Sequence, residues 1–337
     1  MKILLVNKYL YRKGGAETYF IKLGEYLKSL GNEVEYFGMA DERNCVGNRV
    51  EAYTENIDFH KKSLKHITYP FKIIYSVNAR KQIRKVLSNF KPDVVHLNNF
   101  NYQLTPSIIY EIKKHNIPIV YTAHDVQLVC PNHKLKNDYT DGLCRKCDGG
   151  KYFECVKNNC VHSSKIRSIL GAVEAWYYKL RHTYKMIDLT VCPSEFMEKE
   201  ISRNDDINGR TVTMYNFIDE IKPLGAECEN YVLYFGRYSE EKGISNLVKA
   251  AKKLSNIPFV FAGKGELENE VNSADNIKNI GFKTGDELRN IIEKALFTVL
   301  PAEWSENCPF SVMESQSLMT PVLGAKIGGI PELIDDG

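Results

Sequence analysis

The segment YVLYFGRYSEEKGISNL, residues 231–247, passes from a short apolar run through a polar turn into a helix-like pattern. Its apolar part, 231–236, has the length and composition of a strand that is buried on both faces of a sheet. The same alternation of strand-like and helix-like segments already runs through the preceding part of the chain. Its return at residue 231 predicts a second α/β unit with a parallel sheet of its own.

Strand-like segments recur on both sides of this restart, separated by longer helix-like segments. In 16–31, for example, Phe20, Leu23 and Leu27 share one helix face, and Gly31 is suited to end the helix. Ligands bind at the carboxyl ends of the strands in open parallel sheets of this kind. The expected buried strands are 2–6, 93–97, 117–122, 188–192, 231–236, 257–263, 276–282 and 295–301.

Length and composition agree with two domains. A chain of 337 residues exceeds what a single ordinary core supports, and 43% hydrophobic with 26% charged residues is typical of a globular protein. The polar stretch 223–230 shows neither the helical nor the strand periodicity and is the expected linker. This predicts one domain at 1–222 and a second at 223–337. The chain ends one helix after the strand-like segment 321–324, so the second domain is expected to be incomplete.

The distribution of charge says more than its total. A net charge of +3 is too small to indicate nucleic acid as a partner. No apolar run approaches the roughly 18 residues of a membrane span, and the apolar start is too short for a secretory signal, so a cytoplasmic location is expected. Residues 59–92 carry nine Lys or Arg and no Asp or Glu. This stretch is typical either of a surface that lies on the inner face of an anionic membrane or of a solvated helix face.

Two glutamates flank a predicted helix start in ENCPFSVMES, residues 306–315. Pro309 suits the first helical position, which places Glu306 in the preceding loop and Glu314 in the second turn. Eight residues of helix span about 12 Å, too far for a close acid–base pair. A helix N-terminus attracts phosphate, and carboxylates accept hydrogen bonds from hydroxyl groups. The pattern predicts a ligand with a central diphosphate and sugar hydroxyls at both ends, or, alternatively, two solvated acids.

A second charged motif follows the strand at 231–236. Arg237 and Lys242 lie around the turn before a helix, where a guanidinium fork and an ammonium group can together neutralise a diphosphate without a metal. The sequence contains no Asp-x-Asp triplet of the kind that holds a nucleotide-bound divalent metal. Alternatively, the two cations form surface ion pairs with Glu240 and Glu241, each contributing about 0 to 1 kcal/mol.

Taken together, the motifs resemble those of the retaining glycosyltransferases of family 4, which have the GT-B architecture of two facing Rossmann-like domains with parallel sheets. The resemblance covers nearly the whole chain. It implies a sugar donor carried on UDP or GDP and no catalytic metal. The segments that carry it are KGGAET (13–18), YTAHD (121–125), GRYSEEKG (236–243), AGKGE (262–266), the Glu-x7-Glu segment 306–314 and GGIPELI (328–334).

The resemblance also implies roles for individual residues. Arg237 and Lys242 would hold the donor diphosphate, Glu306 the transferred sugar and Glu314 the ribose hydroxyls. His124, at a strand end, would contact the sugar at the reacting centre, and all of these except Glu314 would take part in catalysis. The remaining donor-site positions are Gly14, Gly15, Gly236, Gly281, Phe282, Asn307, Cys308 and Phe310.

The sequence departs from the family pattern at two glycines. Met319 stands where a glycine usually ends the helix after Glu314, and Phe217 replaces another glycine. Neither change touches the charges of the proposed site. The family usually continues beyond this chain with a further strand and helices, which again predicts an incomplete second domain and puts the activity of this chain in doubt.

A cysteine-rich insertion occupies 130–162. Its C-x2-C-x7-C-x4-C spacing predicts either a structural zinc site or free thiols, because disulfides are rare in the cytosol. Cys130 and His133 are alternative ligands. The next segment, 165–185, is basic and contains Trp176, Tyr177 and Tyr184, which suit a membrane interface, an acceptor surface or burial against the sheet. The four cysteines of the spacing are Cys144, Cys147, Cys155 and Cys160.

The expected function is transfer of a sugar from a nucleotide sugar to a glycan or lipid-linked acceptor, in the synthesis of a surface polysaccharide or glycolipid. Two alternatives stay open. One is a sugar-nucleotide epimerase or hydrolase of the same fold, which lacks the pairing of Glu-x7-Glu with the Arg237–Lys242 motif. The other is a zinc-stabilised binding module with impaired catalysis.

Overall fold

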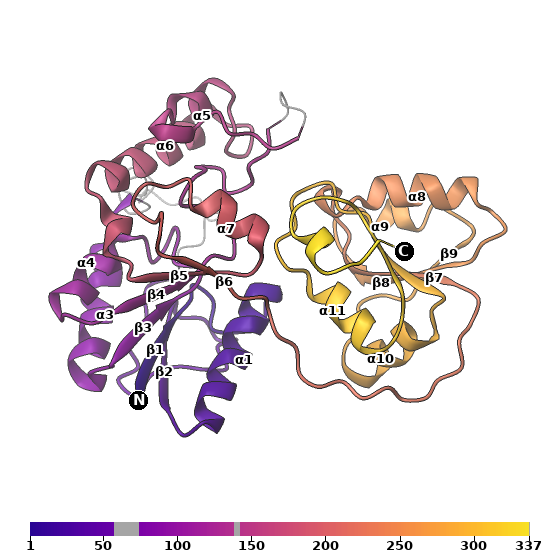
Figure 1. Ribbon diagram of the computed structural model, residues 1–337, viewed down its shortest axis with the longest axis horizontal. Coiled ribbons are helices and arrows are strands. Elements are labelled where there is room, and N and C mark those ends of the chain that lie inside the picture. The colour runs from indigo at the N-terminus through magenta and orange to yellow at the C-terminus, as the bar shows by residue number, and fades with distance from the viewer. Residues whose placement is uncertain (57–73, 138–141, 337) are drawn as a thin grey trace. The chain divides into compact units, whose positions relative to one another are not determined.

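The computed structural model describes residues 1–56, 74–137 and 142–336. The chain divides into two compact units, Met1–Met214 and Tyr215–Gly337, which we describe separately (Figure 1). The domain boundary expected from the polar stretch 223–230 falls later in the chain than this division.

The first unit is built on a parallel six-stranded sheet of order β2-β1-β3-β4-β5-β6. The four strands expected here are present, and β2 and β6 are additional. The expected pattern missed β2 because its two glutamates interrupt the apolar run; Glu35 is nevertheless buried and forms an ion pair with Arg49. The strands are β1 (Lys2–Val6), β2 (Glu33–Phe37), β3 (Val94–Leu97), β4 (Ile119–Thr122), β5 (Leu189–Cys192) and β6 (Thr211–Thr213).

Helices cover both faces of this sheet, because alternate residues of each strand point to opposite sides. Leu4 and Val6 of β1 belong to one buried cluster, whereas Ile3 and Leu5 belong to another that includes Phe20. The elements are α1 (Gly15–Ser29), α3 (Val77–Phe90), α4 (Ser107–Lys114), η2 (Asp148–Gly150), α5 (Phe153–Lys157), α6 (Lys165–Leu180), η3 (Thr183–Met186) and α7 (Glu195–Ile201).

The second unit repeats the design with a parallel five-stranded sheet of order β11-β10-β7-β8-β9. All of its strands had been expected. They are β7 (Val232–Arg237), β8 (Phe259–Lys264), β9 (Ile277–Asn279), β10 (Phe297–Leu300) and β11 (Val322–Gly324). The helices are η4 (Glu240–Lys242), α8 (Ile244–Lys253), α9 (Glu268–Val271), α10 (Gly285–Lys294), α11 (Phe310–Ser317) and η5 (Ile330–Glu332).

Each sheet has one point at which the strand order reverses. The chain leaves β1 toward β2 on one side and returns to β3 on the other, and it leaves β7 toward β8 before returning to β10. The loops that follow the two central strands at such a point diverge and leave a crevice at the carboxyl edge of the sheet. The fold therefore predicts ligand sites beyond β1 and β3 in the first unit and beyond β7 and β10 in the second.

The described part of the basic stretch 59–92 does not face outward throughout. Arg80 and Arg84 of α3 both pair with Glu111 of α4, at 2.9 and 2.6 Å. Hydrogen bonds from Arg84 and Arg80 lower the pKa of this buried carboxyl to about 2. Of the other predicted membrane-facing cations, Lys61, Lys62, Lys65 and Lys72 lie outside the described residues. Among the described residues, no helix is long and apolar enough to cross a bilayer.

Candidate active site

The loops after β7 and β10 meet at a partly buried ion pair. Lys242, at the end of the first loop, forms an ion pair with Oε1 of Glu306 from the second. The indole Nε1 of Trp304 donates to the same carboxylate oxygen at 2.7 Å. Gly243 allows this approach, because a Cβ atom there would lie 1.8 Å from the carbonyl oxygen of Pro301. The structure thus brings together two residues that the sequence placed 64 positions apart.

The GGIPELI motif supports the backbone of this glutamate. Gly329 donates its N–H to the carbonyl oxygen of Glu306 at 2.8 Å. Gly328 has a φ of +62°, and a Cβ atom at this position would lie 2.2 Å from the same oxygen. Only glycine therefore lets the chain pass so close, and this motif holds Glu306 in place.

Arg237 is differently placed from Lys242. It ends β7, its side chain is 66% exposed, and within the described part of the chain it forms one ion pair, a long one of 3.9 Å to Glu241. Its guanidinium group is therefore free to reorient toward a ligand at the carboxyl edge. Gly236 before it has a φ of +145°, a conformation that favours glycine. The pKa of Tyr234 is raised mainly by burial and next by the Glu306 carboxylate, whereas Arg237 lowers it. The side chains of Tyr234, Glu306 and Arg237 therefore influence one another in one region.

The second glutamate lies where the sequence predicted it. Helix α11 begins at Phe310, and Glu314 is half-buried in its second turn. Pro309 is the N-cap residue rather than the first helical residue, so the helix starts one position later than expected. Asn307, Cys308 and Phe310 therefore lie at the end where backbone N–H groups have no partner within the helix. The Cys308 thiol is buried and its pKa is raised by burial, so this residue offers its backbone.

The predicted base-binding residues follow β9 at the same edge of the sheet. Gly281 has a φ of +70° and donates its N–H to Oδ1 of Asn279 at 3.1 Å. Phe282 is largely exposed, and the Lys264 ammonium group lies 5.3 Å from the centre of its ring. An exposed ring with a nearby cation offers a planar surface on which an aromatic base can stack.

In the first unit, His124 is held from two sides. Its Nε2 lies 2.8 Å from Oδ1 of Asn98, which directly follows β3, and its ring packs edge-on against Tyr19 of α1. Burial lowers the pKa of His124 to about 4, although Asp125 opposes this effect. The imidazole is therefore neutral near pH 7. Asn98 was not predicted as a site residue, although a polar residue directly after the strand beside the reversal point was the available signal.

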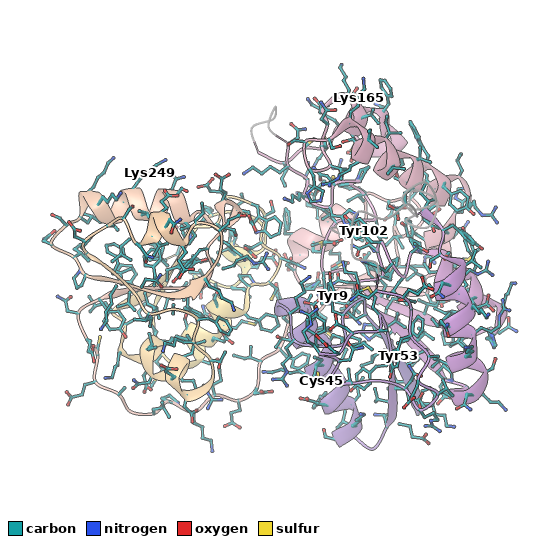
Figure 2. All side chains as sticks on the ribbon, turned by 180° about the vertical axis from the view of Figure 1, so that it is seen from behind. Tyr9, Cys45, Tyr53, Tyr102, Lys165 and Lys249 are labelled. Carbon is teal, nitrogen blue, oxygen red and sulfur yellow. The ribbon has the colours of Figure 1, made fainter. Side chains whose placement is uncertain are left out.

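A further polar group that the sequence did not predict lies at this edge. His133 lies 3.5 Å from Oδ2 of Asp125 and 3.3 Å from the amide of Asn101. Lys8, after β1, donates to Oδ1 of Asn101 at 3.1 Å. The Lys8 ammonium group lies 5.0 Å from the ring centre of Tyr9 and 5.1 Å from that of Tyr102. Both tyrosines are labelled in Figure 2. His133 of the cysteine-rich insertion thus belongs to this polar edge.

Gly14 and Gly15 stand at the start of α1, as predicted. Gly14 is the N-cap residue and has an extended backbone, with φ −164° and ψ −166°. A Cβ atom on Gly14 would lie 3.5 Å from a carboxylate oxygen of Glu17, an ordinary contact. Packing within the chain therefore does not require glycine at this turn.

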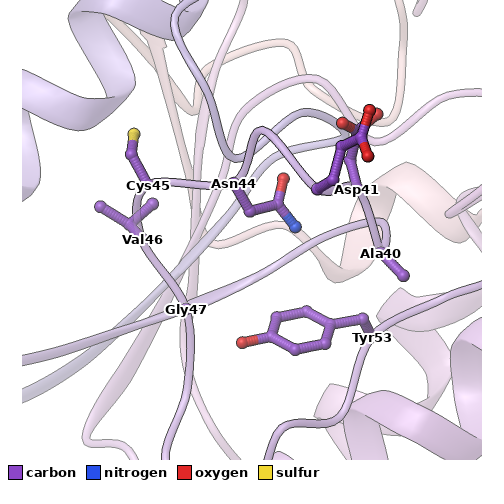
Figure 3. A pocket seen from close by; sticks show the side chains of 8 residues that line it. Ala40, Asp41, Asn44, Cys45, Val46, Gly47 and Tyr53 are labelled. Carbon is purple, nitrogen blue, oxygen red and sulfur yellow. The ribbon is translucent and has the colours of Figure 1, made fainter.

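A cavity of ≈ 660 Å³ lies elsewhere in the first unit, in the loop that follows β2 (Figure 3). Part of its polar lining is used within the loop itself. Asp41 accepts from the backbone N–H and the guanidinium group of Arg43, and Asn44 donates to the carbonyl oxygen of Met39. Oδ1 of Asn44 is buried without a hydrogen-bond partner among the described residues.

Comparison with known proteins explains the arrangement. A family model described as Glycosyltransferase Family 4 matches residues 13–221, and one described as Glycosyl transferases group 1 matches residues 217–337. The chain belongs to glycosyltransferase family 4. With two all-parallel α/β units, its fold is the GT-B architecture that the motifs predicted.

Individual relatives of this family 4 member are distant. An uncharacterized 42.6 kDa protein in the cps region of Klebsiella pneumoniae is 26% identical, over 99% of this chain and 87% of its own length. The amylovoran biosynthesis glycosyltransferase AmsK of Erwinia amylovora is 28% identical, over 31% of this chain and 30% of its own. Anabaena Alr3699/HepE, solved in complex with UDP and glucose, superposes with a TM-score of 0.65 at 16% identity, covering 100% of this chain and 84% of its own.

In this family 4 chain, the cysteines of the insertion come together. Cys144, Cys147, Cys155 and Cys160 line one cavity of ≈ 10 Å³ with Cys130. Burial raises the pKa values of the Cys147 thiol, to about 12, and of the Cys155 thiol. Within the described ranges, no group of three or more His, Cys, Asp or Glu side chains is arranged to hold a metal ion. The thiols are free as they stand, and the zinc site stays a prediction.

Proposed function

We propose that this protein is a retaining glycosyltransferase that moves a hexosyl group from a UDP- or GDP-sugar to a glycan or lipid-linked acceptor. The proposal includes a role in surface polysaccharide or glycolipid synthesis, at the cytoplasmic face of a membrane. Membership of family 4 and the AmsK relative support the reaction class and this setting. The partly buried Lys242–Glu306 pair at the strand-order reversal of the second unit is the observation that carries the proposal.

The chemistry follows from the charges of that pair. An ammonium group has three N–H donors, so Lys242 can hold Glu306 and still donate to a phosphate oxygen. Glu306 accepts from Lys242 and Trp304 through Oε1, which leaves Oε2 for a hydroxyl group of the transferred sugar. Arg237 supplies a second cation with a planar fork. As the bond from sugar to diphosphate breaks, these cations stabilise the growing negative charge, so the proposed reaction needs no divalent metal.

Glu314 and the start of α11 would bind the rest of the nucleotide. The carboxylate accepts hydrogen bonds from ribose hydroxyls, and the backbone N–H groups at Asn307, Cys308 and Phe310 face the diphosphate end of the donor. The exposed ring of Phe282 beside Gly281 would stack on the base. Each of these groups lies at the carboxyl edge of one sheet, as a single extended ligand requires.

In the first unit, neutral His124 would accept or donate one hydrogen bond at the sugar without adding charge. We propose that the acceptor hydroxyl attacks on the face that the diphosphate leaves. A leaving phosphate oxygen takes the proton of that hydroxyl, so the new bond forms as the old one breaks and the anomeric configuration is retained. No protein nucleophile takes part in this reaction.

Replacement of Arg237 tests the donor site. Lys242 is a poorer target, because its loss would leave the Glu306 carboxylate buried without a cation and would mix binding with stability. We expect Arg237→Ala to fold normally and to bind UDP, GDP and their glucose conjugates about 10- to 100-fold more weakly than the wild type, in line with the loss of a charged hydrogen bond. Ligand-induced shifts of the melting temperature measure the affinity, and release of the nucleoside diphosphate measures turnover.

Arg289→Ala is the matched control. Arg289 lies in the same unit and pairs with Asp286 of α10 at 3.0 Å, so its removal takes away an equivalent charge outside the site. The donor assignment is wrong if no nucleotide stabilises the wild type. The role of Arg237 is wrong if its alanine variant binds as tightly as the Arg289 variant.

A further inference from the structure

Helix α6 of the first unit presents a stripe of apolar side chains to solvent. The stripe consists of residues that recur every three or four positions and therefore share one helix face. Ile166 is 74% exposed and Leu180, fourteen positions along, is 79% exposed. The full set is Ile166, Ile169, Val173, Trp176 and Leu180.

The opposite face of α6 accounts for its attachment to the unit. Ser168, Ala172 and Tyr178 are buried there. Of the aromatic residues predicted to face either a membrane or the sheet, Tyr184 is buried, but Trp176 is not. The helix is therefore attached through this face, and no residue of the apolar stripe belongs to a buried cluster of the described residues.

Trp176 has the contacts of an interfacial residue. Its indole Nε1 donates to the carbonyl oxygen of Gly150 at 2.9 Å, and its ring packs edge-on against Tyr152 of the cysteine-rich insertion. The polar end of the ring is satisfied while 36% of the residue stays exposed. A tryptophan with a satisfied N–H and an exposed ring suits the boundary between water and lipid.

The charges around the stripe favour one kind of partner. Residues 142–185 contain nine Lys or Arg against three Asp or Glu, although Arg145 pairs with the buried Glu200 of α7 and Lys179 lies 3.9 Å from Asp205. Lys165 and Arg167, at the N-terminal end of α6, are exposed, and Lys165 is labelled in Figure 2. An apolar face about 20 Å long, flanked by cations, complements the headgroups and the acyl boundary of an anionic bilayer.

We propose that the stripe on α6 is a docking surface for an anionic lipid bilayer. This proposal rests on the membrane association in the proposed function and names the surface that makes the contact. It does not depend on how the donor is bound. The side chains of the stripe enter the headgroup boundary, and the flanking cations lie at the level of the lipid phosphates. The helix lies along the membrane plane and does not cross the membrane.

Vesicle binding tests the surface. The wild type is expected to cosediment with vesicles of phosphatidylcholine and phosphatidylglycerol at 3:1, less so at high salt, and not with phosphatidylcholine alone. The double variant Ile166→Ser/Leu180→Ser removes the two most exposed members of the stripe. We expect its vesicle affinity to fall at least about 10-fold.

Leu30→Ser is the matched control. Leu30 is the C-cap residue of α1 and is 60% exposed, so the same change is made at a helix end outside the stripe. This variant should bind vesicles like the wild type. All variants should keep the far-ultraviolet circular dichroism and the nucleotide binding of the wild type, because neither site belongs to the donor edge.

Three results would overturn the proposal. The wild type could ignore anionic vesicles, or the double variant could bind them as tightly as the Leu30 variant. The third is a concentration-dependent dimer, seen by analytical ultracentrifugation, that the double variant abolishes, which would assign the stripe to a second copy of the chain. Loss of nucleotide binding with vesicle binding intact would instead reject the proposed function and leave this surface standing.

Discussion

At the scale of single residues, the side chain of Asn98 carries a free-energy cost. Its Oδ1 is hydrogen-bonded to His124, but its buried Nδ2 has no partner in the described part of the chain. A buried N–H group without a partner costs about 1 to 3 kcal/mol. An apolar residue would avoid that cost, so the amide is best explained by what it does for the imidazole. With Oδ1 accepting, His124 carries its proton on Nε2 and leaves Nδ1 as an acceptor.

The substitution Asn98→Asp tests this positioning. A carboxylate beside Nε2 should raise the pKa of His124 by about 1 to 3 pH units from its value of about 4. The other groups that face the ring are Asp125, His96 of β3 and Tyr19 of α1, and all are unchanged in the variant. The new pKa would lie at about 5 to 7, so the variant should lose transfer activity as the pH falls through that range and keep most of it above pH 7. Nuclear magnetic resonance of the imidazole carbons against pH gives the pKa directly.

Asn98→Leu provides the contrast, because it removes the amide without adding charge. We expect its stability to stay within about 1 kcal/mol of the wild type, because the orphaned N–H of Asn98 disappears while the imidazole N–H loses its acceptor, and the two costs are similar. Its activity should fall at every pH. A wild-type imidazole that carries its proton on Nδ1, shown by nitrogen chemical shifts, would contradict the assignment.

The same depressed pKa has a consequence for stability. His124 has a folded-state pKa of about 4, below its ordinary value of 6.5, so the unfolded chain binds its proton more readily. Its contribution to folding is therefore unaffected above pH 6.5 and turns unfavourable as the pH falls from 6.5 toward 4.

At the scale of elements, the end of α11 shows why one family glycine matters. Met319 follows the C-cap residue and has a φ of +58°, the left-handed conformation that glycine adopts most easily. The N–H of Thr320 bonds to the carbonyl oxygen of Ser315, and that of Met319 to Gln316, a Schellman pair that ends the helix. Met319 thus replaces the family glycine at the cost of backbone strain.

Met319→Gly should relieve that strain. We expect the free energy of unfolding to rise by about 0.5 to 1 kcal/mol, because the relieved left-handed strain slightly exceeds the added entropy of the unfolded chain. Urea unfolding followed by circular dichroism measures the change.

The control for this substitution is Met319→Ala. The side chain is 78% exposed and makes few contacts, so the alanine variant keeps the strain and should resemble the wild type. Equal stabilities of the glycine and alanine variants would show that the strain at this position does not exceed the entropy that glycine adds to the unfolded chain.

At the scale of the whole molecule, each unit has buried clusters of its own. Leu4 and Phe20 belong to clusters of the first unit, and Leu233 and Phe261 to clusters of the second. Every buried cluster among the described residues lies within one of the two units. Each unit therefore has a core of its own and meets the usual condition for independent cooperative unfolding.

Calorimetry should accordingly resolve two unfolding transitions. A nucleoside diphosphate should raise the transition temperature of the second unit alone, because only the state that binds it is stabilised. Leu233→Ala removes a fully buried side chain from that unit. It should lower the temperature of the same transition by an amount equivalent to about 2 to 5 kcal/mol. A single transition, with equal calorimetric and van't Hoff enthalpies, would show that the units unfold together.

The sequence alone was sufficient for the architecture. Apolar runs of strand length that alternate with helical periods predicted nine of the eleven strands found among the described residues, because burial on both faces demands a continuous apolar run. The two missed strands fail that condition. β2 carries glutamates whose charge Arg49 neutralises in space, and β6 is a three-residue strand at the edge of its sheet.

The tertiary structure decided which side chains meet. Residue spacing placed Arg237, Lys242 and Glu306 at a carboxyl edge, but only strand order joined Lys242 to Glu306 and left Arg237 exposed. It also supplied Asn98 as the partner of His124 and turned the apolar stripe of α6 toward solvent. Local patterns specify secondary structure because periodicity acts over neighbouring residues. Pairings across tens of residues depend on how the elements pack, which no local period encodes.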